Sequence, residues 1–500
     1  MHSASDVLII GSGIGGATLA YGLVQRGVRV TMLERGVSLP REAQNWNVNE
    51  VFHNKRYVPQ EEWLDKDGAS FRPGNYYYVG GSSKLFGATM MRMREQDFEA
   101  LAHEGGSSPA WPIRYADLAP YYDRAERLYQ VHGRVGADPT APPGMQAYPF
   151  PEMPSEPFIE KVAEALKDIG VCAFPIPAAI QNHQGGACIQ CNTCDGFPCR
   201  INAKNDAEVA AIGPALATGL LELRTDCMVE RLVLSADGRK VESVQYQEGG
   251  VKKSLSAPIV VLACSAVNSA ALLLRSACPQ APNGVANTSD VVGRYYMAHN
   301  NTALMSIGWR VNPTSFQKTL SINDFYFGDA DYPLPMGNIQ LLGKLQSGML
   351  TAGQKHVPPI VGTMMAQRSV DWWVMSEDLP DPENRVTLQA GRIKVSYTAN
   401  NLGGHRQLVS RAVGMMKNIG FKLNIVKFMG GLSVSHQCGT VRFGTDPSSA
   451  ALDPFCRSFD HRNLFVVDAS FMPSSSAVNP ALTIAAQALR VADHIATSDL

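Results

Sequence analysis

The feature that most constrains the fold of this chain is a glycine-rich turn. The sequence GSGIGG at residues 11–16 matches the pattern G-x-G-x-x-G, follows the apolar run 7–10 and precedes a stretch of helical composition. In a dinucleotide-binding unit, the first glycine (Gly11) permits the tight turn and the second (Gly13) lets the backbone approach a pyrophosphate. The third (Gly16) lets the helix pack closely on the strand. The pattern therefore predicts a strand, a turn and a helix that together bind a dinucleotide.

An acidic residue supports the same prediction. Glu34 follows a second apolar run, 28–33, and the usual position of the ribose-binding acid is about 20 residues after the glycine turn. A carboxylate at this point accepts hydrogen bonds from ribose hydroxyls. Because it would repel a 2′-phosphate, it disfavours NADP and leaves NAD and FAD as candidate cofactors.

The charge balance of the chain argues against nucleic acid and anionic membranes as partners. The 500 residues include 44 basic and 45 acidic side chains, for a net charge of −1 at pH 7, and the basic residues are scattered. The apolar stretch 257–277 contains Cys264, Ser265 and Arg275, so we expect a buried strand and a helix there and not a membrane span. Residues 1–6 lack the basic segment of a secretory signal. We therefore expect a soluble, cytoplasmic protein.

The order of apolar patterns along the chain predicts one domain inserted into another. The run 464–467 and the helical stretch 483–496 repeat the opening pattern, whereas the section 302–389 alternates short β-prone runs with turn residues. We expect an α/β dinucleotide-binding domain and an α+β substrate-binding domain that contains an antiparallel sheet. The expected ranges are 1–105, 180–300 and 432–500 for the first domain, 106–179 for a connecting insertion and 301–431 for the substrate-binding domain.

Beyond the glycine turn, further blocks of the sequence resemble the glucose–methanol–choline (GMC) oxidoreductases. The block VGGSSKLFGA at residues 79–88 is followed by others in the order typical of that family. These are WPI at 111–113 with YDRAE at 122–126, EDLP at 377–380 with NRV at 384–386, and NLFVVDAS at 463–470 with NPALT at 479–483. The resemblance implies bound FAD and an architecture like that of p-hydroxybenzoate hydroxylase, with a Rossmann-like FAD-binding domain.

The resemblance also implies which residues contact the cofactor. The loop 79–88 is expected to lie against the flavin, and Asp468 beside it. A helix that starts after Pro480 can direct its positive end at the electron-rich end of reduced flavin. Some relatives attach FAD through a histidine in the loop, which contains none here, so we expect non-covalent FAD. The expected cofactor-binding residues are Gly11, Gly13, Gly16, Glu34, Arg35, Gly81, Ser82, Ser83, Gly87, Val229, Ala263, Asp468, Pro480 and Thr483.

Two residues match the catalytic pair of the family. His436, in the sequence HQCGT, matches the catalytic histidine, and Asn479 falls on a position that is His or Asn in relatives. The reaction needs a base for the hydroxyl proton while hydride moves to flavin N5, and imidazole titrates near neutrality. Asn479 can donate its amide hydrogens to the substrate oxygen, and it also stands where it would cap the final helix. His299, which ends the segment GRYYMAH, is expected to be structural.

Four cysteines leave the presence of a metal open at this point. Cys188, Cys191, Cys194 and Cys199 have the spacing C-x2-C-x2-C-x4-C, which is close to a ferredoxin pattern but not equal to it. Four thiolates would also satisfy a structural zinc site. Some relatives have cysteines before a segment similar to AKND at 203–206 without any metal. We therefore expect free thiols packed near the FAD-binding domain and no bound metal.

The substrate is predicted from the resemblance alone. The loop ending in MRMR at 91–94, together with the tryptophan and cysteine blocks, looks most like a bacterial branch with pyranose-oxidase-like and glycoside 3-oxidase members. This implies oxidation of a secondary hydroxyl of a sugar or glycoside to a ketone, with oxygen or a quinone as electron acceptor. Met364, Met365, Trp372 and Trp373 would alternatively suit a steroid or another hydrophobic alcohol, although such residues are more often core. A further alternative is an electron-transfer flavoprotein with an iron–sulfur cluster at the four cysteines.

Overall fold

A parallel sheet forms one half of the molecule and is assembled from segments far apart in the sequence. In this computed structural model, which describes residues 5–352, 358–433 and 436–500, the strands lie in the order β20-β12-β1-β2-β8. Every neighbouring pair is parallel. The strands are β1 (Val7–Ile10), β2 (Val30–Leu33), β8 (Leu221–Arg224), β12 (Ile259–Leu262) and β20 (Leu464–Val466). Four of them are buried throughout, as expected for a parallel sheet that is covered on both faces.

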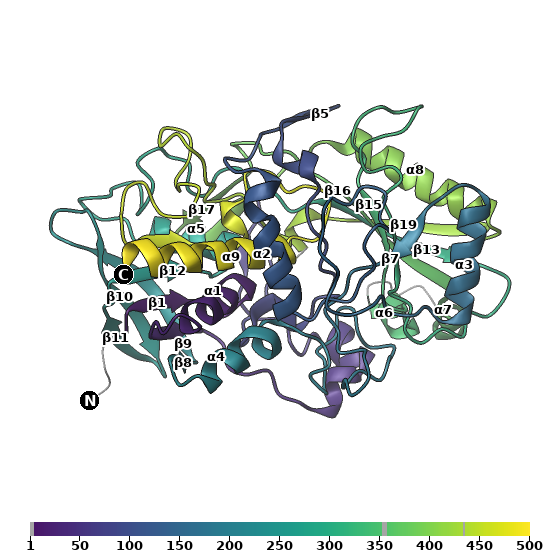
Figure 1. Cartoon of the computed structure of the whole chain (residues 1–500), viewed down its shortest axis with the longest axis horizontal. Helices are drawn as coiled ribbons and strands as arrows, with labels where there is room; N and C mark the ends of the chain where they lie inside the picture. The colour runs from purple at the N-terminus through teal and green to yellow at the C-terminus, as the bar shows by residue number, and fades with distance from the viewer. Residues whose placement is uncertain (1–4, 353–357, 434–435) are drawn as a thin grey trace.

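Two helices that are distant in the sequence pack together beside this sheet. α1 (Ile14–Val24) follows β1, and α9 (Ala481–His494) follows β20, and they lie side by side (Figure 1). Gly22 permits the close approach, because a Cβ at this position would press on Ala492 and Leu489. The stretch predicted to be a buried strand and a helix consists of β12 and α5 (Ala266–Arg275).

A six-stranded antiparallel sheet forms the other half, in the order β19-β13-β16-β15-β14-β7. Its strands are β7 (Ala173–Pro175), β13 (Asn300–Ile307), β14 (Leu320–Ile322), β15 (Asn338–Leu341), β16 (Ser369–Ser376) and β19 (Leu423–Met429). α3 (Pro157–Asp168) and α8 (Leu402–Asn418) pack on its outer side and form a second core with it (Figure 1). Because successive residues of a strand point to opposite faces, Trp372 enters this core while Trp373 faces the inner side.

Two short strand groups pair across the predicted domain ranges. β7 lies within the predicted connecting insertion, yet it forms the edge of the antiparallel sheet next to β14. β17 (Arg385–Gln389) and β18 (Arg392–Ser396) lie within the predicted substrate-binding range. They join β3 (Trp63–Leu64) and β4 (Ser70–Phe71) in a four-stranded sheet. Local sequence patterns do not reveal such pairings, because the partners are far apart along the chain.

The remaining elements surround these two halves. α2 (Tyr115–Leu128) packs on α9. A three-stranded antiparallel sheet consists of β9 (Cys227–Leu234), β10 (Val241–Glu248) and β11 (Val251–Leu255). A hairpin consists of β5 (Leu101–His103) and β6 (Gly106–Ser108). The short helices are α4 (Gly213–Ala217), α6 (Ser347–Ala352) and α7 (Pro359–Ala366). Along the described part of the chain, no helix has both the length and the apolar character needed to cross a membrane.

Candidate active site

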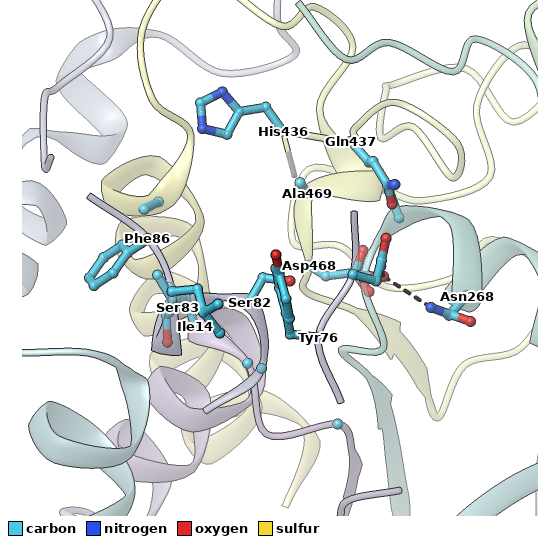
Figure 2. A pocket seen from close by; sticks show the side chains of 18 of the residues that line it. Ile14, Tyr76, Ser82, Ser83, Phe86, Asn268, His436, Gln437, Asp468 and Ala469 are labelled. Atoms are coloured by element: carbon cyan, nitrogen blue, oxygen red, sulfur yellow. Dashed lines mark hydrogen bonds between the residues drawn. The ribbon is translucent and has the colours of Figure 1, made fainter. Parts of the chain in front are cut away.

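A cavity of about 550 Å³ is lined by residues of both sheets. One end is formed by the carboxyl ends of β1, β2 and β12 together with the glycine turn, which is where open α/β sheets bind ligands. Asn301, Gln340 and Trp373 of the antiparallel sheet line the same cavity, as does His436. Figure 2 shows that His436 and its neighbour Gln437 point in opposite directions along this cavity.

Backbone packing explains the glycines of the first turn. Gly11 has a φ of +99°, and a Cβ there would clash with the carbonyl oxygen of Ala263. A Cβ on Gly16 would clash with the carbonyl oxygen of Gly11, so Gly16 lies behind the cavity wall and allows the helix to approach the strand. A Cβ on Gly13 would meet nothing within 4 Å, and Gly13 lines the cavity. The space at Gly13 is therefore open to a ligand.

A second glycine turn lies directly against the first. Gly80 and Gly81 have φ values of +92° and +58°, and a Cβ on Gly81 would lie 3.1 Å from the Cα of Gly13. The Gly80 N–H donates to Ser12 Oγ at 3.1 Å, and Ser83 Oγ donates to the Gly80 carbonyl at 2.6 Å. The two turns make a surface of main chain in front of the N-terminus of α1, whose first turn contains no acidic residue. Free N–H groups at such a helix end favour a phosphate.

Glu34 is held by three hydrogen bonds at the same end. Its Oε2 accepts from Ser12 N at 3.0 Å and from Ser12 Oγ at 2.6 Å, and its Oε1 accepts from Gly36 N at 2.8 Å. Burial raises the pKa of Glu34, while these hydrogen bonds lower it. A carboxylate has about four lone-pair sites, so Glu34 can also accept from a ribose hydroxyl. Arg35 lines the cavity with its guanidinium 3.7 Å from the centre of the Tyr77 ring.

Of the residues expected to bind the cofactor, all except Gly16 and Thr483 line the cavity. Thr483 is buried, and its hydroxyl pairs with the Tyr122 hydroxyl at 2.8 Å, so it faces α2. Successive side chains on a helix point in different directions, and α9 presents Pro480, Ala481 and Ile484 to the cavity instead.

Asp468 lies two residues after the end of β20 and lines the cavity with its neighbour Ala469 (Figure 2). Its carboxylate accepts hydrogen bonds from the hydroxyl of Ser269 and from Ser470 N, the latter at 2.9 Å. Burial raises the pKa of Asp468, and these hydrogen bonds oppose that rise. The aspartate is thus fixed in place between α5 and the strand that precedes it.

Three buried polar atoms on the cavity wall have no hydrogen-bond partner among the described residues: Asn75 Oδ1, Gln437 Nε2 and Gln437 Oε1. Buried polar groups are normally hydrogen-bonded, so these atoms indicate where a bound molecule supplies the partners. Together with the glycine turns, Glu34 and the N-termini of α1 and α9, they fit the phosphates, ribose and ring of FAD. Neither Asn75 nor Gln437 was predicted from the sequence, because isolated amides carry no motif.

We call the end of the cavity away from the first glycine turn the reacting end, because it contains His436 and Asn479, the two residues expected to be catalytic. An antiparallel bridge pairs Met297 with Cys438, which places residue 299 opposite residue 436. Accordingly, Nδ1 of His436 lies 3.1 Å from Nδ1 of His299. Burial, followed by the nearby His299 and Lys318, lowers the pKa of His436 to about 3. His436 is therefore neutral at neutral pH and can accept a proton.

Asn479 is oriented by a chain of hydrogen bonds. Its Oδ1 accepts from Gln340 Nε2 at 3.0 Å, and Gln340 Oε1 accepts from Thr89 Oγ1 at 3.1 Å. Because the amide oxygen is engaged, the NH₂ group of Asn479 is left to donate to a ligand. The expected capping role is not seen: Pro480 is the N-cap residue of α9, and no side chain caps that helix.

A partly buried ion pair and one tryptophan complete this end. Lys318 Nζ lies 2.8 Å from Asp195 Oδ2, and a Cβ on Gly87 would clash with both side chains. Of the four residues considered for an apolar pocket, only Trp373 is among the lining residues of the cavity. Trp372 belongs to the second core, and Met364 and Met365 lie on α7. Lys318, Asp195 and Gln340 gave no signal in the sequence, since each is an ordinary polar residue outside any motif.

The four cysteines do not line the cavity, although Asp195 and Gly196, which lie between Cys194 and Cys199, do. Within residues 5–352, 358–433 and 436–500, no group of three or more His, Cys, Asp or Glu side chains is arranged to hold a metal. Burial raises the pKa of Cys194 to about 12 and also raises that of Cys188. The sulfur of Cys199 accepts from Ala203 N at 3.2 Å. Metals bind the thiolate form of cysteine. The surroundings of Cys188 and Cys194 favour the thiol form and therefore do not favour metal binding.

Comparison with known proteins connects this geometry to one enzyme family. A family model described as GMC oxidoreductase matches residues 5–301, and a second with the same description matches residues 381–488. Paromamine 6′-oxidase of Streptomyces fradiae is 30% identical over 532 residues, which cover 98% of this chain and 91% of the relative. Fructose dehydrogenase large subunit of Gluconobacter japonicus is 27% identical, over 98% of each chain.

The solved structures show the same fold. Pyridoxine 4-oxidase from Mesorbium loti matches with a TM-score of 0.69 at 19% identity, over 98% of this chain and 99% of that one. The predicted fold class, a parallel Rossmann-like sheet with an antiparallel-sheet substrate part, is thereby confirmed.

Proposed function

The chain belongs to the GMC oxidoreductase family and is an FAD-dependent oxidoreductase acting on CH–OH groups, and we propose that its substrate is a sugar or a glycoside. In this proposal a secondary ring hydroxyl is oxidised to a ketone, as in pyranose-oxidase-like and glycoside 3-oxidase members, and FAD is bound without a covalent link. The observation that carries the proposal is that His436 and Asn479 line the same cavity as the two glycine turns and Glu34.

Each residue of the pair has one task. Bound FAD supplies the hydride acceptor for this chemistry. His436 accepts the proton of the substrate hydroxyl, because its lowered pKa keeps the imidazole unprotonated before the reaction. Asn479 donates an amide hydrogen to the same oxygen, and its hydrogen bond with Gln340 keeps the NH₂ group available. Asn479 has no basic lone pair, so the proton cannot be passed to it.

The sugar class is supported by the relatives and by the cavity wall. Two relatives are named for paromamine and fructose. Trp373 offers an apolar ring face, while Gln340 and the Lys318–Asp195 pair offer hydrogen bonds. A few polar groups set among apolar ones fix the orientation of a small ligand. This mixture suits a polyhydroxylated ring better than a steroid.

An anaerobic absorption spectrum tests the proposal. The flavin bands of the purified holoenzyme are recorded before and after adding glucose, fructose, paromamine, a plant glycoside, a sterol and a long-chain alcohol. We expect bleaching by at least one of the sugars or glycosides and a ketone as the product. Bleaching by the sterol or the long-chain alcohol alone would overturn the sugar assignment, and an aldehyde product would move the reaction to a primary hydroxyl.

Two further readings come from the same sample. Admitting air after bleaching shows whether oxygen reoxidises the flavin, and adding a quinone without air tests the other acceptor. Precipitating the protein with acid should release all of the FAD into the supernatant. Yellow colour that stays in the pellet would contradict non-covalent binding.

A further inference from the structure

We propose that His299 is a positioning residue that holds His436 in the tautomer whose bare Nε2 faces the substrate hydroxyl. The inference rests on the proposed function of His436 as the base, and it adds the proton arrangement and a third residue. Its basis is a chain of two hydrogen bonds that ends at a main-chain carbonyl.

The hydrogen bond between His299 and Ser475 determines which nitrogen of His299 carries a hydrogen. His299 Nε2 lies 3.0 Å from the carbonyl oxygen of Ser475. A carbonyl oxygen only accepts hydrogen bonds, so His299 Nε2 carries a hydrogen. His299 is buried, with 1% of its surface exposed, so the Ser475 carbonyl takes the place of water as the partner of Nε2. The proton on Nε2 leaves Nδ1 of a neutral His299 as an acceptor.

The contact between His299 and His436 determines which nitrogen of His436 carries a hydrogen. The two Nδ1 atoms of His299 and His436 lie 3.1 Å apart, with the ring planes at 85°. A hydrogen bond between them needs a proton on one of the two nitrogens. If both rings are neutral, that proton belongs to His436, because His299 already holds its single proton on Nε2. His436 Nε2 is then the nitrogen with a free lone pair.

The alternative is a His299 ring with a hydrogen on both nitrogens that donates from Nδ1 to His436. The hydrogen bonds of that ring go to an imidazole and to a main-chain carbonyl, and neither is a counter-charge. The charged groups around the two rings are Asp378, Lys318 and Asp195. Both oxygens of Asp378 accept from the main chain, at 2.8 Å from Ala298 N and 2.9 Å from His299 N.

Asp378 receives two more hydrogen bonds, from the hydroxyls of Tyr397 and Ser475 at 2.9 Å and 3.2 Å. No hydrogen bond to this carboxylate comes from the His299 ring among the described contacts. Asp378 therefore holds the backbone of the histidine, and the ring remains free to bridge His436 and the Ser475 carbonyl.

The backbone at His299 is itself unusual. Its φ is +63°, a left-handed conformation that is uncommon for residues other than glycine. Such conformations persist where surrounding structure imposes them, and they cluster at functional sites. Here Asp378 and the bridge between Met297 and Cys438 impose it. The result is that the His299 ring reaches His436.

The arrangement determines how the proton moves. When the substrate O–H bond breaks, its proton forms an N–H bond at His436 Nε2, and His436 becomes an imidazolium. Its Nδ1–H remains bonded to His299 Nδ1, so no other proton has to move during the step. The opposite tautomer, with the proton on Nε2, has no lone pair to offer the substrate. His299 excludes that tautomer.

Nuclear magnetic resonance of the holoenzyme tests the inference without any substrate. The protein is labelled with ¹⁵N-histidine, and its ring nitrogens are assigned with the variants His299→Asn and His436→Gln. We expect a hydrogen on Nδ1 and a bare Nε2 for His436, and a hydrogen on Nε2 only for His299. A hydrogen on His436 Nε2 at neutral pH, or a doubly protonated His299, overturns the inference.

Two substitutions test the same arrangement by kinetics. His299→Leu removes the acceptor, and we expect the rate of flavin reduction to fall about 100-fold with little change in KM. His299→Asn keeps an acceptor near the position of Nδ1 and should stay within about tenfold of the wild type. Asparagine also tolerates the left-handed backbone, so the tautomer of His436 must be read in both variants. A mainly Nδ1-protonated His436 in His299→Leu overturns the inference.

His405→Leu is the matched control. His405 is a buried histidine outside the cavity, bonded at 2.8 Å to the hydroxyls of Thr302 and Ser376. Its loss should lower Tm without changing the tautomer of His436 or the rate of flavin reduction; an equal loss of rate in this variant overturns the positioning role. The two proposals also fail separately. Sugars that do not bleach the flavin contradict the proposed function, whereas the wrong tautomer contradicts only the role of His299.

Discussion

At one end of the cavity the wall is main chain, and at the other it consists of side chains. The cofactor end includes two glycine turns, the N-terminus of α1 and the carboxylate of Glu34. Each of these features belongs to a short local pattern in the sequence. The reacting end gathers Thr89, His299, Gln340, His436 and Asn479 from separate segments. We expect the backbone shape of the cofactor end to determine the binding of FAD. We expect the hydrogen-bonded side chains of the reacting end to determine the rate at which the flavin is reduced. Substitutions should therefore separate binding of FAD from its reduction.

The largest expected effect is at Gly11. Gly11→Val combines a backbone φ of +99° with a clash against the Ala263 carbonyl, so we expect a loss of about 4 kcal/mol or more in the free energy of unfolding and no bound FAD. Tm and the ratio of flavin to protein absorbance measure both. Gly414→Ala is the control, since a Cβ there meets nothing within 4 Å on α8. Stoichiometric FAD in Gly11→Val would show that the turn is not a structural requirement.

A smaller effect limited to binding is expected at Glu34. Glu34→Gln puts an NH₂ group among the donors Ser12 and Gly36, so the Kd for FAD should rise about tenfold, which corresponds to about 1.4 kcal/mol. Titration of the apoprotein with FAD measures this change. At saturating FAD the rate of flavin reduction should stay within about twofold of the wild type. Slow flavin reduction in Glu34→Gln at saturating FAD would contradict the claim that the cofactor end affects binding of FAD and not its reduction.

The reverse result is expected at Gln340. Gln340→Leu frees the amide of Asn479 to rotate, so flavin reduction should slow about tenfold, the equivalent of one lost hydrogen bond, while the Kd for FAD is unchanged. Rapid mixing without oxygen gives the rate, and Thr89→Val, the outer link, should have a weaker effect in the same direction. If Gln340→Leu raises the Kd for FAD but its flavin is reduced at the wild-type rate at saturating FAD, the assignment of Gln340 to the reacting end is wrong.

The smallest effect is a change in pH dependence at Lys318. As the proposed base, His436 works only when unprotonated, and its lowered pKa of about 3 keeps it so. The rate of flavin reduction should therefore be flat from pH 8 to pH 5. Lys318 lowers the pKa of His436 and Asp195 raises it. Lys318→Met therefore raises that pKa, and the acid limb should move to higher pH by about one unit or less. Neutralising Asp195 as well should reverse part of the shift; a shift to lower pH contradicts this charge assignment.

The same division explains what was predictable from the sequence. GSGIGG, Glu34 and the blocks around 79–88 and 463–470 are local patterns whose geometry follows from a few neighbouring residues, and they led to the fold and to most of the cavity wall. Gly16 and Thr483 belong to the same motifs but lie behind the wall. A motif identifies an element, whereas packing decides which of its side chains face the ligand.

The partners of His436 and Asn479, the proposed catalytic pair, could not be predicted in this way. His299 was expected to be structural, yet its Nδ1 lies 3.1 Å from Nδ1 of His436, because an isolated bridge pairs Met297 with Cys438, 141 residues further along the chain. Gln340 and Lys318 reach the cavity through the register of the antiparallel sheet and its neighbouring loops. Such contacts depend on tertiary pairing, which no single segment of sequence encodes.

The most direct test of the account is a single-turnover measurement on His436→Ala. The variant and the wild type are mixed without oxygen with a sugar or glycoside that bleaches the wild-type flavin, and reduction is followed at the flavin band. We expect His436→Ala to bind FAD with normal affinity and to be reduced about 10² to 10⁴ times more slowly, the usual contribution of a general base. Reduction at the wild-type rate would contradict the assignment of His436 as the base.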